Sequence, residues 1–456
     1  MSIIIPSNSI VSGGFSVDNS CRFDDGSSDT MSRDNGTPTN LKKFSISLWF
    51  KRTEPGLNKY LITGFDTEDN RALLQFSSDQ LLFQNQTGGS NNTIIKSNAV
   101  FRDPSAWYHF CIIVDTTQGT DTNRVKMYVN GSQVTSLASS TYPSVNTDLE
   151  LTDSANSILL NQKGDGSDFN SGYYSEVVVL DGTAASITDF GEFDEDSGIW
   201  KPIDVSGLTF GNNGFYLDFE NSGALGADVS GNSNNFTVNN LTAIDQSTDT
   251  CTNNFATLNP LDVNGIVLSE GNLNAGSAGA TWRSTRGTFG MSSGKWYWEM
   301  KIIGGNTPID AQIGVGSFEL AIASNGEWSS ANPSVAYSSG DGSKKVNGTS
   351  SSYGASFTTN DIIGVAFDVD NLNVTFYKNG ASQGAITTGF SASDTFACEV
   401  AFYGRGGGTT NGSFNFGSPP YAISSGNTDG DGYGNFEYAV PSGYFSLNTK
   451  NLAEYG

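Results

Sequence analysis

Alternation of apolar and polar residues with a period of two is the feature that most constrains this chain of 456 residues. In the segment 44–50 (FSISLWF), the four apolar residues at even positions share one face, as in a strand with one buried side. Turn clusters of Gly, Asn, Asp and Ser separate such runs, and no amphipathic helix of about 12 residues is evident. The chain is therefore predicted to be all-β, with antiparallel β-sandwiches. Further runs of this kind are WYHFCIIVD (107–115), RVKMYVN (124–130), YSEVVVLD (174–181), GKWYWEMKI (294–302), DIIGVAFDVD (361–370), NLNVTFYKN (371–379) and FACEVAFY (396–403).

A hairpin pattern that occurs twice predicts two sandwiches in tandem. In each copy a buried strand ends in Asp, a second strand returns, and an Asn-Gly pair follows, at Asn130-Gly131 and at Asn379-Gly380. Asn-Gly favours the positive φ angles of a tight turn, and one sheet holding every strand would be unusually large. We expect a first sandwich with its extension over 1–240, an irregular linker over 241–264, a second sandwich over 265–420 and a loop-rich C-terminal tail over 421–456.

The charge balance limits the classes of partner. The chain has 23 Lys and Arg against 47 Asp and Glu, which gives a formal net charge of −24. A chain this acidic repels phosphate backbones, so nucleic acid is excluded as a partner. Only 15% of the residues are charged, and the surface must therefore be covered largely by uncharged polar groups.

The N-terminal stretch predicts neither an export signal nor a membrane segment. Its apolar run ends at Pro6, and no Lys or Arg precedes Arg22. No later apolar run approaches the roughly 18 residues that a membrane-spanning helix needs. We expect a soluble chain that is made in a cytoplasm without standard secretory export and inserts into no membrane.

Histidine and cysteine are too few for several kinds of chemistry. His109 is the only imidazole, so hydrolytic triads have at most one candidate base, and zinc sites with two or more histidines are excluded. His109 lies in an apolar strand, where a packing or hydrogen-bonding role is expected. The four cysteines, Cys21, Cys111, Cys251 and Cys398, are scattered and form no CxxC, which predicts reduced thiols.

Motifs in each half carry a resemblance to a known domain. The first half, roughly 15–185, resembles a laminin-G-like, concanavalin-A-like lectin domain through FSISLWFKR, WYHFCIIVD, MYVNG and YYSEVVVLDG. The second half, roughly 265–417, resembles a SPRY domain through GKWYWEMKI, IGVGSF, DIIGVAFDVD, FYKNG and SFNFG. Both resemblances imply β-sandwiches whose rims carry binding loops.

The layout as a whole is similar to a family of tailed-bacteriophage virion proteins that is common among marine phages. The segments that carry this resemblance are SIIIPSNSI, FGEFDEDSGIWKP, DVSGNSNNFTVNNLTAIDQSTDTCTNNFATLNP and PSGYFSLNTKNLAEYG. It implies a tail fibre or capsid-surface appendage that is made in the host cytoplasm and resides in the virion. Its partners would be other virion proteins and further copies of itself, and the resemblance implies no particular ligand.

An enzymatic reading fails at one position. Concanavalin-A-like glucanases carry E-x-D-x-x-E on one strand, because retaining hydrolysis needs two carboxyl groups about 5 Å apart. The nearest segment here is 192–197 (EFDEDS), where Ser197 replaces the third carboxylate and no strand alternation follows. We expect a solvated acidic connector and no enzymatic activity, with a polysaccharide depolymerase as the weaker alternative.

Calcium is the only metal that the sequence suggests, because Asp and Asn in Gly-rich loops supply hard oxygen ligands. One candidate is Asn427, Asp429 and Asp431, although the closing Glu437 stands one place short of the position held by Tyr438. The alternative for this segment is a flexible turn. A second candidate site, suggested by the calcium sites on laminin-G rims, would use as ligands Asp165, Asp168 and Asn170.

Sugar recognition would use aromatic faces in polar loops. Trp328, Tyr337 and Tyr353 are expected in loops between SPRY strands, whereas Trp296 and Trp298 alternate within a strand and are expected in the core. We therefore expect a non-enzymatic protein of the virion that recognises a host-surface glycan through its loops. The alternative is a purely structural assembly or cementing protein, whose loops contact other virion proteins.

Overall fold

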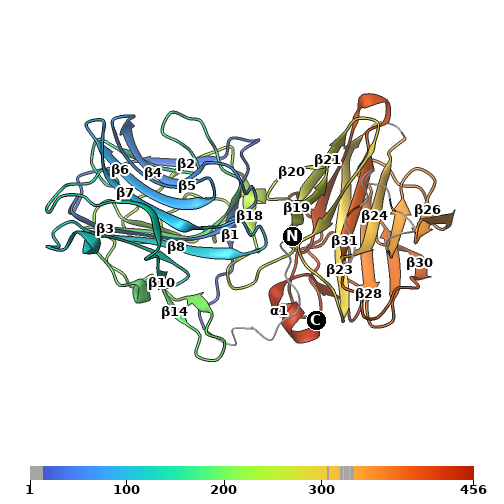
Figure 1. Cartoon of the computed structure of the whole chain (residues 1–456). Helices are drawn as coiled ribbons and strands as arrows, with labels where there is room; N and C mark the ends of the chain where they lie inside the picture. Colours follow the sequence, from blue (N-terminus) through green and yellow to red (C-terminus); the bar gives the residue numbers. More distant parts are fainter. Residues whose placement is uncertain (1–13, 306–307, 319–321, 323–327, 329–332) are drawn as a thin grey trace. The chain divides into compact units, whose positions relative to one another are not determined.

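The computed structural model describes residues 14–305, 308–318, 322, 328 and 333–456. The chain forms two compact units, here called the N-terminal unit, which ends at Thr252, and the C-terminal unit, which starts at Asn253. Each unit is a pair of antiparallel sheets around its own apolar core (Figure 1). The prediction of tandem β-sandwiches is confirmed. No helix among the described residues is long and apolar enough to cross a membrane.

Two eight-stranded sheets and a short hairpin build the N-terminal unit. The first sheet contains, in spatial order, Ser132–Gln133 (β10), Val125–Val129 (β9), Trp107–Asp115 (β8), Lys43–Arg52 (β3), Gly172–Asp181 (β13), Ser20–Phe23 (β1) and Gln246–Ser247 (β18), and Phe215–Leu217 (β16) pairs with β13. The second contains Leu137–Thr141 (β11), Ser90–Val100 (β7), Gln80–Thr87 (β6), Asn70–Ser77 (β5), Lys59–Thr67 (β4), Ser157–Leu160 (β12), Thr30–Asp34 (β2) and Thr237–Asn239 (β17). Gly191–Phe193 (β14) pairs with Trp200–Pro202 (β15), and short 3₁₀ turns lie at Asp121–Asn123, Ile187–Asp189 and Ala243–Asp245.

A seven-stranded and an eight-stranded sheet build the C-terminal unit. The seven-stranded sheet contains Leu258–Asn264 (β19), Trp282–Gly287 (β22), Phe396–Tyr403 (β31), Ala311–Ser317 (β24), Ser334–Ser338 (β25), Ser343–Val346 (β26) and Thr349–Ser352 (β27). The other contains Val267–Ser269 (β20), Asn274–Ala278 (β21), Thr409–Asn415 (β32), Lys295–Gly305 (β23), Ile362–Asp368 (β28), Asn373–Lys378 (β29) and Ala381–Thr387 (β30), and Phe445–Ser446 (β33) pairs with β23. A 3₁₀ turn lies at Arg405–Gly407, and one α-helix, Thr449–Tyr455 (α1), follows β33.

The repeated hairpin is present in both units. β8 pairs with β9 and β28 pairs with β29, each in antiparallel register. The Asn-Gly pairs lead into the next strand, and all four residues have positive φ angles, from 46° at Asn130 to 77° at Gly380. The local turn chemistry of Asn-Gly thus specifies the same connection twice.

The stretch expected to be an irregular linker, 241–264, is part of both units. Its first half adds β18 to the sheet beside β1, and its second half forms β19. The units divide between Thr252 and Asn253, within that stretch. The absence of apolar alternation was misleading here, because backbone pairing and side-chain hydrogen bonds can order a polar segment without an apolar face.

The segment expected to be a loop-rich tail, 421–456, is also packed into a unit. Phe436, Leu447 and Leu452 are buried in the C-terminal unit. The buried Glu299 carboxylate accepts hydrogen bonds from the backbone N–H groups of residues 437 and 438, at 3.0 and 2.9 Å. Glycine-rich sequence therefore does not mean a free tail here, because its backbone donors find a buried acceptor.

Candidate binding site

The face of the seven-stranded sheet that points away from the core carries a row of small and polar side chains. Gln312 of β24 lies opposite Ser338 of β25 on one side and Ala401 of β31 on the other. Ala401 in turn lies opposite Ser284 of β22. Alternate residues such as Ile313 belong to the core cluster, so the row faces outward.

Several buried polar atoms on this face have no hydrogen-bond partner in the described structure. They are the side-chain oxygens of Ser284, Gln312, Ser334 and Ser338. Gln312 is 4% exposed and Ser338 is 9% exposed, so bulk water does not solvate them freely. A buried polar group without a partner costs about 1–3 kcal/mol, and native chains keep few of them. Such a row therefore points to a ligand or bound waters.

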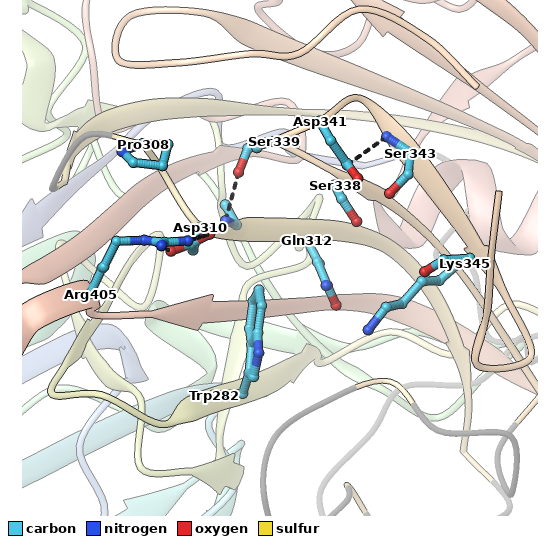
Figure 2. A pocket seen from close by; sticks show the side chains of 13 residues that line it. Trp282, Pro308, Asp310, Gln312, Ser338, Ser339, Asp341, Ser343, Lys345 and Arg405 are labelled. Atoms are coloured by element: carbon cyan, nitrogen blue, oxygen red, sulfur yellow. Dashed lines mark hydrogen bonds and ion pairs between the residues drawn. The ribbon is translucent and has the colours of Figure 1, made fainter. Parts of the chain in front are cut away.

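A pocket of about 360 Å³ opens over one end of the row (Figure 2). Because Trp282 contributes its largest side chain, we call it the Trp282 pocket. The Trp282 ring is partly exposed and lies 5.7 Å from the Tyr403 ring between centroids. An aromatic face beside oriented hydrogen-bonding groups can hold a small polar molecule by stacking and hydrogen bonds. The pocket is lined by Trp282, Pro308, Asp310, Ala311, Gln312, Ser338, Ser339, Gly340, Asp341, Ser343, Lys345, Ser350 and Arg405.

A bidentate ion pair holds one wall of the Trp282 pocket. Arg405 donates from Nε and from an Nη to the two carboxylate oxygens of Asp310, at 2.8 and 3.0 Å. Ser339 orders the neighbouring backbone, because its hydroxyl donates to the carbonyl of Ile309 at 2.7 Å and accepts from the N–H of Ala311 at 2.8 Å. This wall is thus set before any ligand arrives.

The second pair of charges in the pocket lies on the other side of the row. Asp341 accepts the backbone N–H of Ser343 at 2.9 Å, and hydrogen bonds from Ser343 lower the pKa of this carboxyl, with a smaller contribution from the charge of Lys345. Asp341 therefore stays ionised near neutral pH. A carboxylate of this kind accepts hydrogen bonds and does not donate a proton.

Farther along the same face, Arg286 and Glu399 lie opposite each other in the register. The guanidinium Nε lies 3.4 Å from a Glu399 carboxylate oxygen. Burial raises the pKa of Glu399 to about 7, the charge of Arg286 opposes this shift and that of Asp262 adds to it. This ion pair occupies the face beyond the polar row.

Of the three aromatic residues expected in loops, Tyr337 is placed differently. It lies on β25 with its ring in the core, against Phe357 at 4.9 Å and Phe376 at 5.4 Å, and it donates its hydroxyl hydrogen to the carbonyl of Ala355. The expectation of an accessible loop ring is wrong, because SVAYS is a complete five-residue strand whose central alternation is hidden among serines. Its ring has no open face for a sugar.

The other two aromatic residues, Trp328 and Tyr353, expose little of their rings for contact with a ligand. Trp328 is 5% exposed and packs against Ala336 and Ala401 on the outer face. Tyr353 is half-buried, with its ring edge on Tyr337 at 5.4 Å, and it donates to the carbonyl of Gly384. These side chains cover and brace the sheet, whereas Trp282, which the sequence analysis did not single out, lines the pocket. As expected, Trp296 and Trp298 are fully buried in the core.

The C-terminal calcium candidate is a hydrogen-bonded turn. Asp429 accepts from the backbone N–H of Asp431 and Tyr433 through one oxygen, and from Ser446 and Asn451 through the other. Asn427 donates to the carbonyls of residues 436 and 437. Asp429 thus uses its oxygens to hold the chain.

The rim candidate is arranged in a similar way. Asp165 accepts from the backbone and hydroxyl of Ser167 and pairs with Lys163 at 2.9 Å, and these hydrogen bonds lower the pKa of its carboxyl. Asp168 is exposed with a φ of 56°, and Asn170 is buried. Among the described residues no group of three or more His, Cys, Asp or Glu side chains is placed to hold a metal ion. Calcium stays a prediction that these turns do not support.

The acidic segment 192–197 is also organised by hydrogen bonds. Asp194 accepts from the backbone and hydroxyl of Ser197, both at 2.9 Å, and pairs with Lys201 at 3.2 Å. The hydrogen bonds from Ser197 lower the pKa of Asp194 to about 2. A carboxyl group that is so acidic is unsuited to donate a proton to a leaving group.

His109 forms a hydrogen bond with a serine, but the direction of this bond is the reverse of the one that a catalytic base needs. Trp200 donates its indole N–H to His109 Nδ1 at 3.1 Å, so the hydrogen of the neutral ring is on Nε2, which lies 2.8 Å from the Ser47 hydroxyl. His109 therefore donates to Ser47 and takes no proton from it. Burial lowers the pKa of His109 to about 3 and keeps the ring neutral. The expected hydrogen-bonding role is confirmed, as are the four free cysteines.

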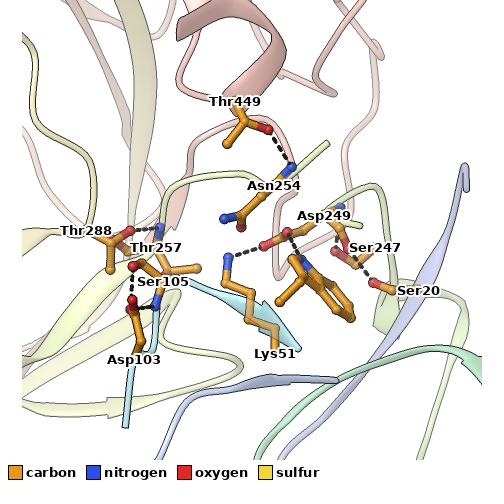
Figure 3. A network of polar contacts seen from close by, with 11 residues as sticks. Ser20, Lys51, Asp103, Ser105, Ser247, Asp249, Asn254, Thr257, Thr288 and Thr449 are labelled. Atoms are coloured by element: carbon orange, nitrogen blue, oxygen red, sulfur yellow. Dashed lines mark hydrogen bonds and ion pairs between the residues drawn. The ribbon is translucent and has the colours of Figure 1, made fainter. Parts of the chain in front are cut away.

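A buried ion pair in the N-terminal unit is likewise fully partnered (Figure 3). Lys51 Nζ lies 2.6 Å from Asp249 Oδ2, Trp107 donates to Oδ1 at 2.9 Å, and Ser20 donates to the carbonyl of Asp249 at 2.6 Å. Burial lowers the pKa of Lys51, and Asp249 opposes that shift. This network attaches the end of the unit to its sheet, and the charged groups of Lys51 and Asp249 are engaged with each other and with Trp107.

Comparison with known protein families finds one domain match in each half of the chain. Residues 25–186 match the concanavalin A-like lectin/glucanases superfamily, and residues 295–419 match the SPRY domain. The order of a laminin-G-like domain followed by a SPRY domain is therefore confirmed. No curated protein matches the chain in sequence.

Solved structures similar to parts of the chain share little sequence with it. The SPRY domain of human HERC1 is 19% identical with a TM-score of 0.31, and the match covers 34% of this chain and 96% of that one. A candidate carbohydrate-binding protein from Bacteroides ovatus is 16% identical with a TM-score of 0.34, over 48% of this chain and 57% of that one. A heptameric SAP-like pentraxin from Limulus polyphemus is 18% identical with a TM-score of 0.27, and the match covers 35% of this chain and 72% of that one.

Proposed function

We propose that this chain is a non-enzymatic recognition protein of a phage virion, a tail fibre or capsid-surface subunit, which binds a host-surface glycan through the Trp282 pocket. One observation carries the binding role. The unpartnered oxygens of Gln312 and Ser338 lie in the wall of a pocket that an aromatic side chain also lines. The location in the virion, with other virion proteins and further copies of the chain as partners, rests on the resemblance of the terminal and connecting segments to phage proteins.

The proposed binding uses rigid parts of the fold. Gln312 and Ser338 lie on paired strands, and Asp310 is fixed by Arg405, so a ligand meets groups that are already oriented. A sugar ring would stack on Trp282 and hydrogen-bond to the polar row. One such site binds modestly, and many copies on one particle raise the effective affinity through multivalency.

The absence of catalysis in this proposal rests on the carboxyl groups of the pocket. Both oxygens of Asp310 accept from Arg405, and hydrogen bonds lower the pKa of Asp341. Glycoside hydrolysis requires one carboxyl group that is protonated at working pH to act as the acid. This pair favours binding over the alternative of a polysaccharide depolymerase.

The test measures attachment of the purified full chain to cells of the host and to surface polysaccharide extracted from them. Trp282→Ala should weaken attachment at least tenfold, whereas Phe193→Ala, which removes an exposed aromatic ring in the N-terminal unit, should not change it. Equal attachment by wild type and Trp282→Ala, or the release of reducing ends from the polysaccharide, would refute the proposal.

A second candidate function, a structural assembly or cementing protein, is favoured by apolar side chains at one edge of the C-terminal unit. Leu261 and Val263 on β19 and Val267 on β20 are exposed, Val267 by 72%. Particles carrying Val267→Asp would then assemble poorly. Particles carrying Trp282→Ala would assemble and adsorb normally, which is the opposite of what recognition through the pocket predicts.

A further inference from the structure

The charges that line the Trp282 pocket balance one another. Arg405 is held by Asp310 through two hydrogen bonds. Hydrogen bonds from Ser343 lower the pKa of Asp341, and the positive charge of Lys345 adds to this shift. Two carboxylates and two cations line the pocket, so its formal charge sums to zero. An anionic ligand at Arg405 would have to displace Asp310, at the cost of the ligand's desolvation and of the broken ion pair, and any charged ligand would meet a like charge in the same pocket.

The groups that do lack partners are uncharged. Gln312 Oε1 is an amide oxygen that can only accept a hydrogen bond, and Ser338 Oγ can accept or donate. A buried acceptor requires a donor, and sugar hydroxyl and N-acetyl N–H groups are donors, whereas a carboxylate is not. The open positions of the pocket therefore select for hydrogen-bond donors without charge.

Size and long-range charge favour the same class of ligand. About 360 Å³ is near the lower end of ligand pockets, which span about 300–1,000 Å³, and suits one or two sugar units. The formal charge of the whole chain, −24, repels anionic sugars before they reach the pocket. Neutral sugars experience no such repulsion.

We infer, on the basis of the proposed function, that the Trp282 pocket takes an uncharged sugar unit and discriminates against sugars that carry a carboxylate. Gln312 determines this specificity by accepting a hydrogen bond from a ligand hydroxyl or N-acetyl group. Trp282 supplies the stacking surface, and the Arg405–Asp310 ion pair holds one wall. Binding to this site should depend little on salt, because no net charge is neutralised when the ligand enters.

The experiment measures saturation-transfer NMR and dissociation constants for the full chain with methyl glycosides in matched pairs. The probes are methyl glucoside with methyl glucuronide and methyl galactoside with methyl galacturonide, together with methyl N-acetylglucosaminide. We expect at least one neutral probe to bind, its acidic counterpart to bind at least tenfold more weakly, and the neutral affinity to change less than twofold between 50 and 500 mM NaCl.

Two variants separate the parts of the inference. Gln312→Leu keeps the approximate volume but removes the acceptor, and it should weaken the neutral probe about tenfold. Thr349→Val alters an exposed position on β27 that does not line the pocket and should bind as wild type does. Thermal unfolding of each variant checks that the unit is folded.

The outcomes distinguish failure of the inference from failure of the proposed function. Tighter binding of an acidic probe than of its neutral counterpart, lost on Trp282→Ala, overturns the inference and leaves a glycan site in place. Unchanged binding by Gln312→Leu overturns the role of that residue. If no probe binds, or if binding persists unchanged in Trp282→Ala, the pocket is not a sugar site, and the proposed function fails together with the inference.

Discussion

Each unit has a sheet face that points away from its main core, and the two faces are treated in opposite ways. In the N-terminal unit, a cluster of Trp49, Trp107, Tyr173 and Trp200 covers part of this face. In the C-terminal unit, the corresponding row contains serine, glutamine and alanine, with an open pocket above it. The β14–β15 hairpin supplies Trp200 to the first face.

The polar groups on the two faces also differ, because those of the N-terminal unit have hydrogen-bond partners and several of those in the C-terminal unit do not. His109, under the aromatic cluster, has a partner for each ring nitrogen, Ser47 and Trp200. Gln312 and Ser338, in the open row, have side-chain oxygens without a partner in the described structure. A face that the protein's own chain closes gains stability from its satisfied polar groups, whereas the open face gains none from these oxygens, and it is there that we propose a ligand binds.

The largest expected change in the free energy of unfolding comes from removing Trp200, which covers the outward face of the N-terminal unit. Trp200→Ala should destabilise the N-terminal unit by about 3–5 kcal/mol, because it removes a buried ring that stacks near His109 and leaves Nδ1 without its donor. Denaturant unfolding of the full chain, followed by circular dichroism, measures this. Trp282→Ala, the control in the open pocket, should cost less than about 1 kcal/mol. Equal costs would remove the distinction between the two faces.

A pH effect of intermediate size is expected on both faces, because each contains a buried carboxyl group. Burial raises the pKa of Glu176, which accepts from Tyr216 at 2.6 Å, to about 8, and that of Glu399 to about 7. A raised folded-state pKa means that the folded state binds more protons than the unfolded state above about pH 4.5. Each of these carboxyl groups therefore contributes most to stability at low pH. Its contribution decreases as the pH rises from about 4.5 to the pKa that the group has in the folded state.

We expect the N-terminal unit to lose roughly 2–4 kcal/mol between pH 5 and pH 8 through Glu176. Glu176→Gln should remove most of this loss, because an amide does not ionise. Urea unfolding at several pH values measures the slope for each variant. A wild-type slope that persists unchanged in Glu176→Gln would contradict the assignment to this residue.

The smallest effect comes from deleting one hydroxyl group in each unit. Ser47→Ala should cost about 1–3 kcal/mol, because it leaves the Nε2–H of the buried His109 without an acceptor. Ser338→Ala removes a hydroxyl that has no partner and should change stability by less than about 0.5 kcal/mol. Urea midpoints for the two variants provide the comparison. A large cost for Ser338→Ala would show that its hydroxyl already has a structural partner, such as a bound water.

The strands, the duplicated hairpin and the tandem order of the two domains could all be predicted from the sequence. Period-two alternation and Asn-Gly turns are local properties, and they decide which segments extend and where they reverse. The core positions of Trp296 and Trp298 followed from the same alternation. Local pattern failed for Tyr337, whose strand is short and flanked by serines, and for 421–456, whose glycines suggested a loop.

The class of fold and the presence of two units follow from local sequence pattern, because alternation and turn chemistry act between neighbouring residues. Which outward face is closed and which is open depends on how segments far apart in the chain pack together, and local pattern does not reveal it. Trp200 meets His109 across 91 positions, and Arg405 meets Asp310 across 95. No local pattern marks Gln312 as unpartnered, since the lack of a partner is a property of everything that packs around it.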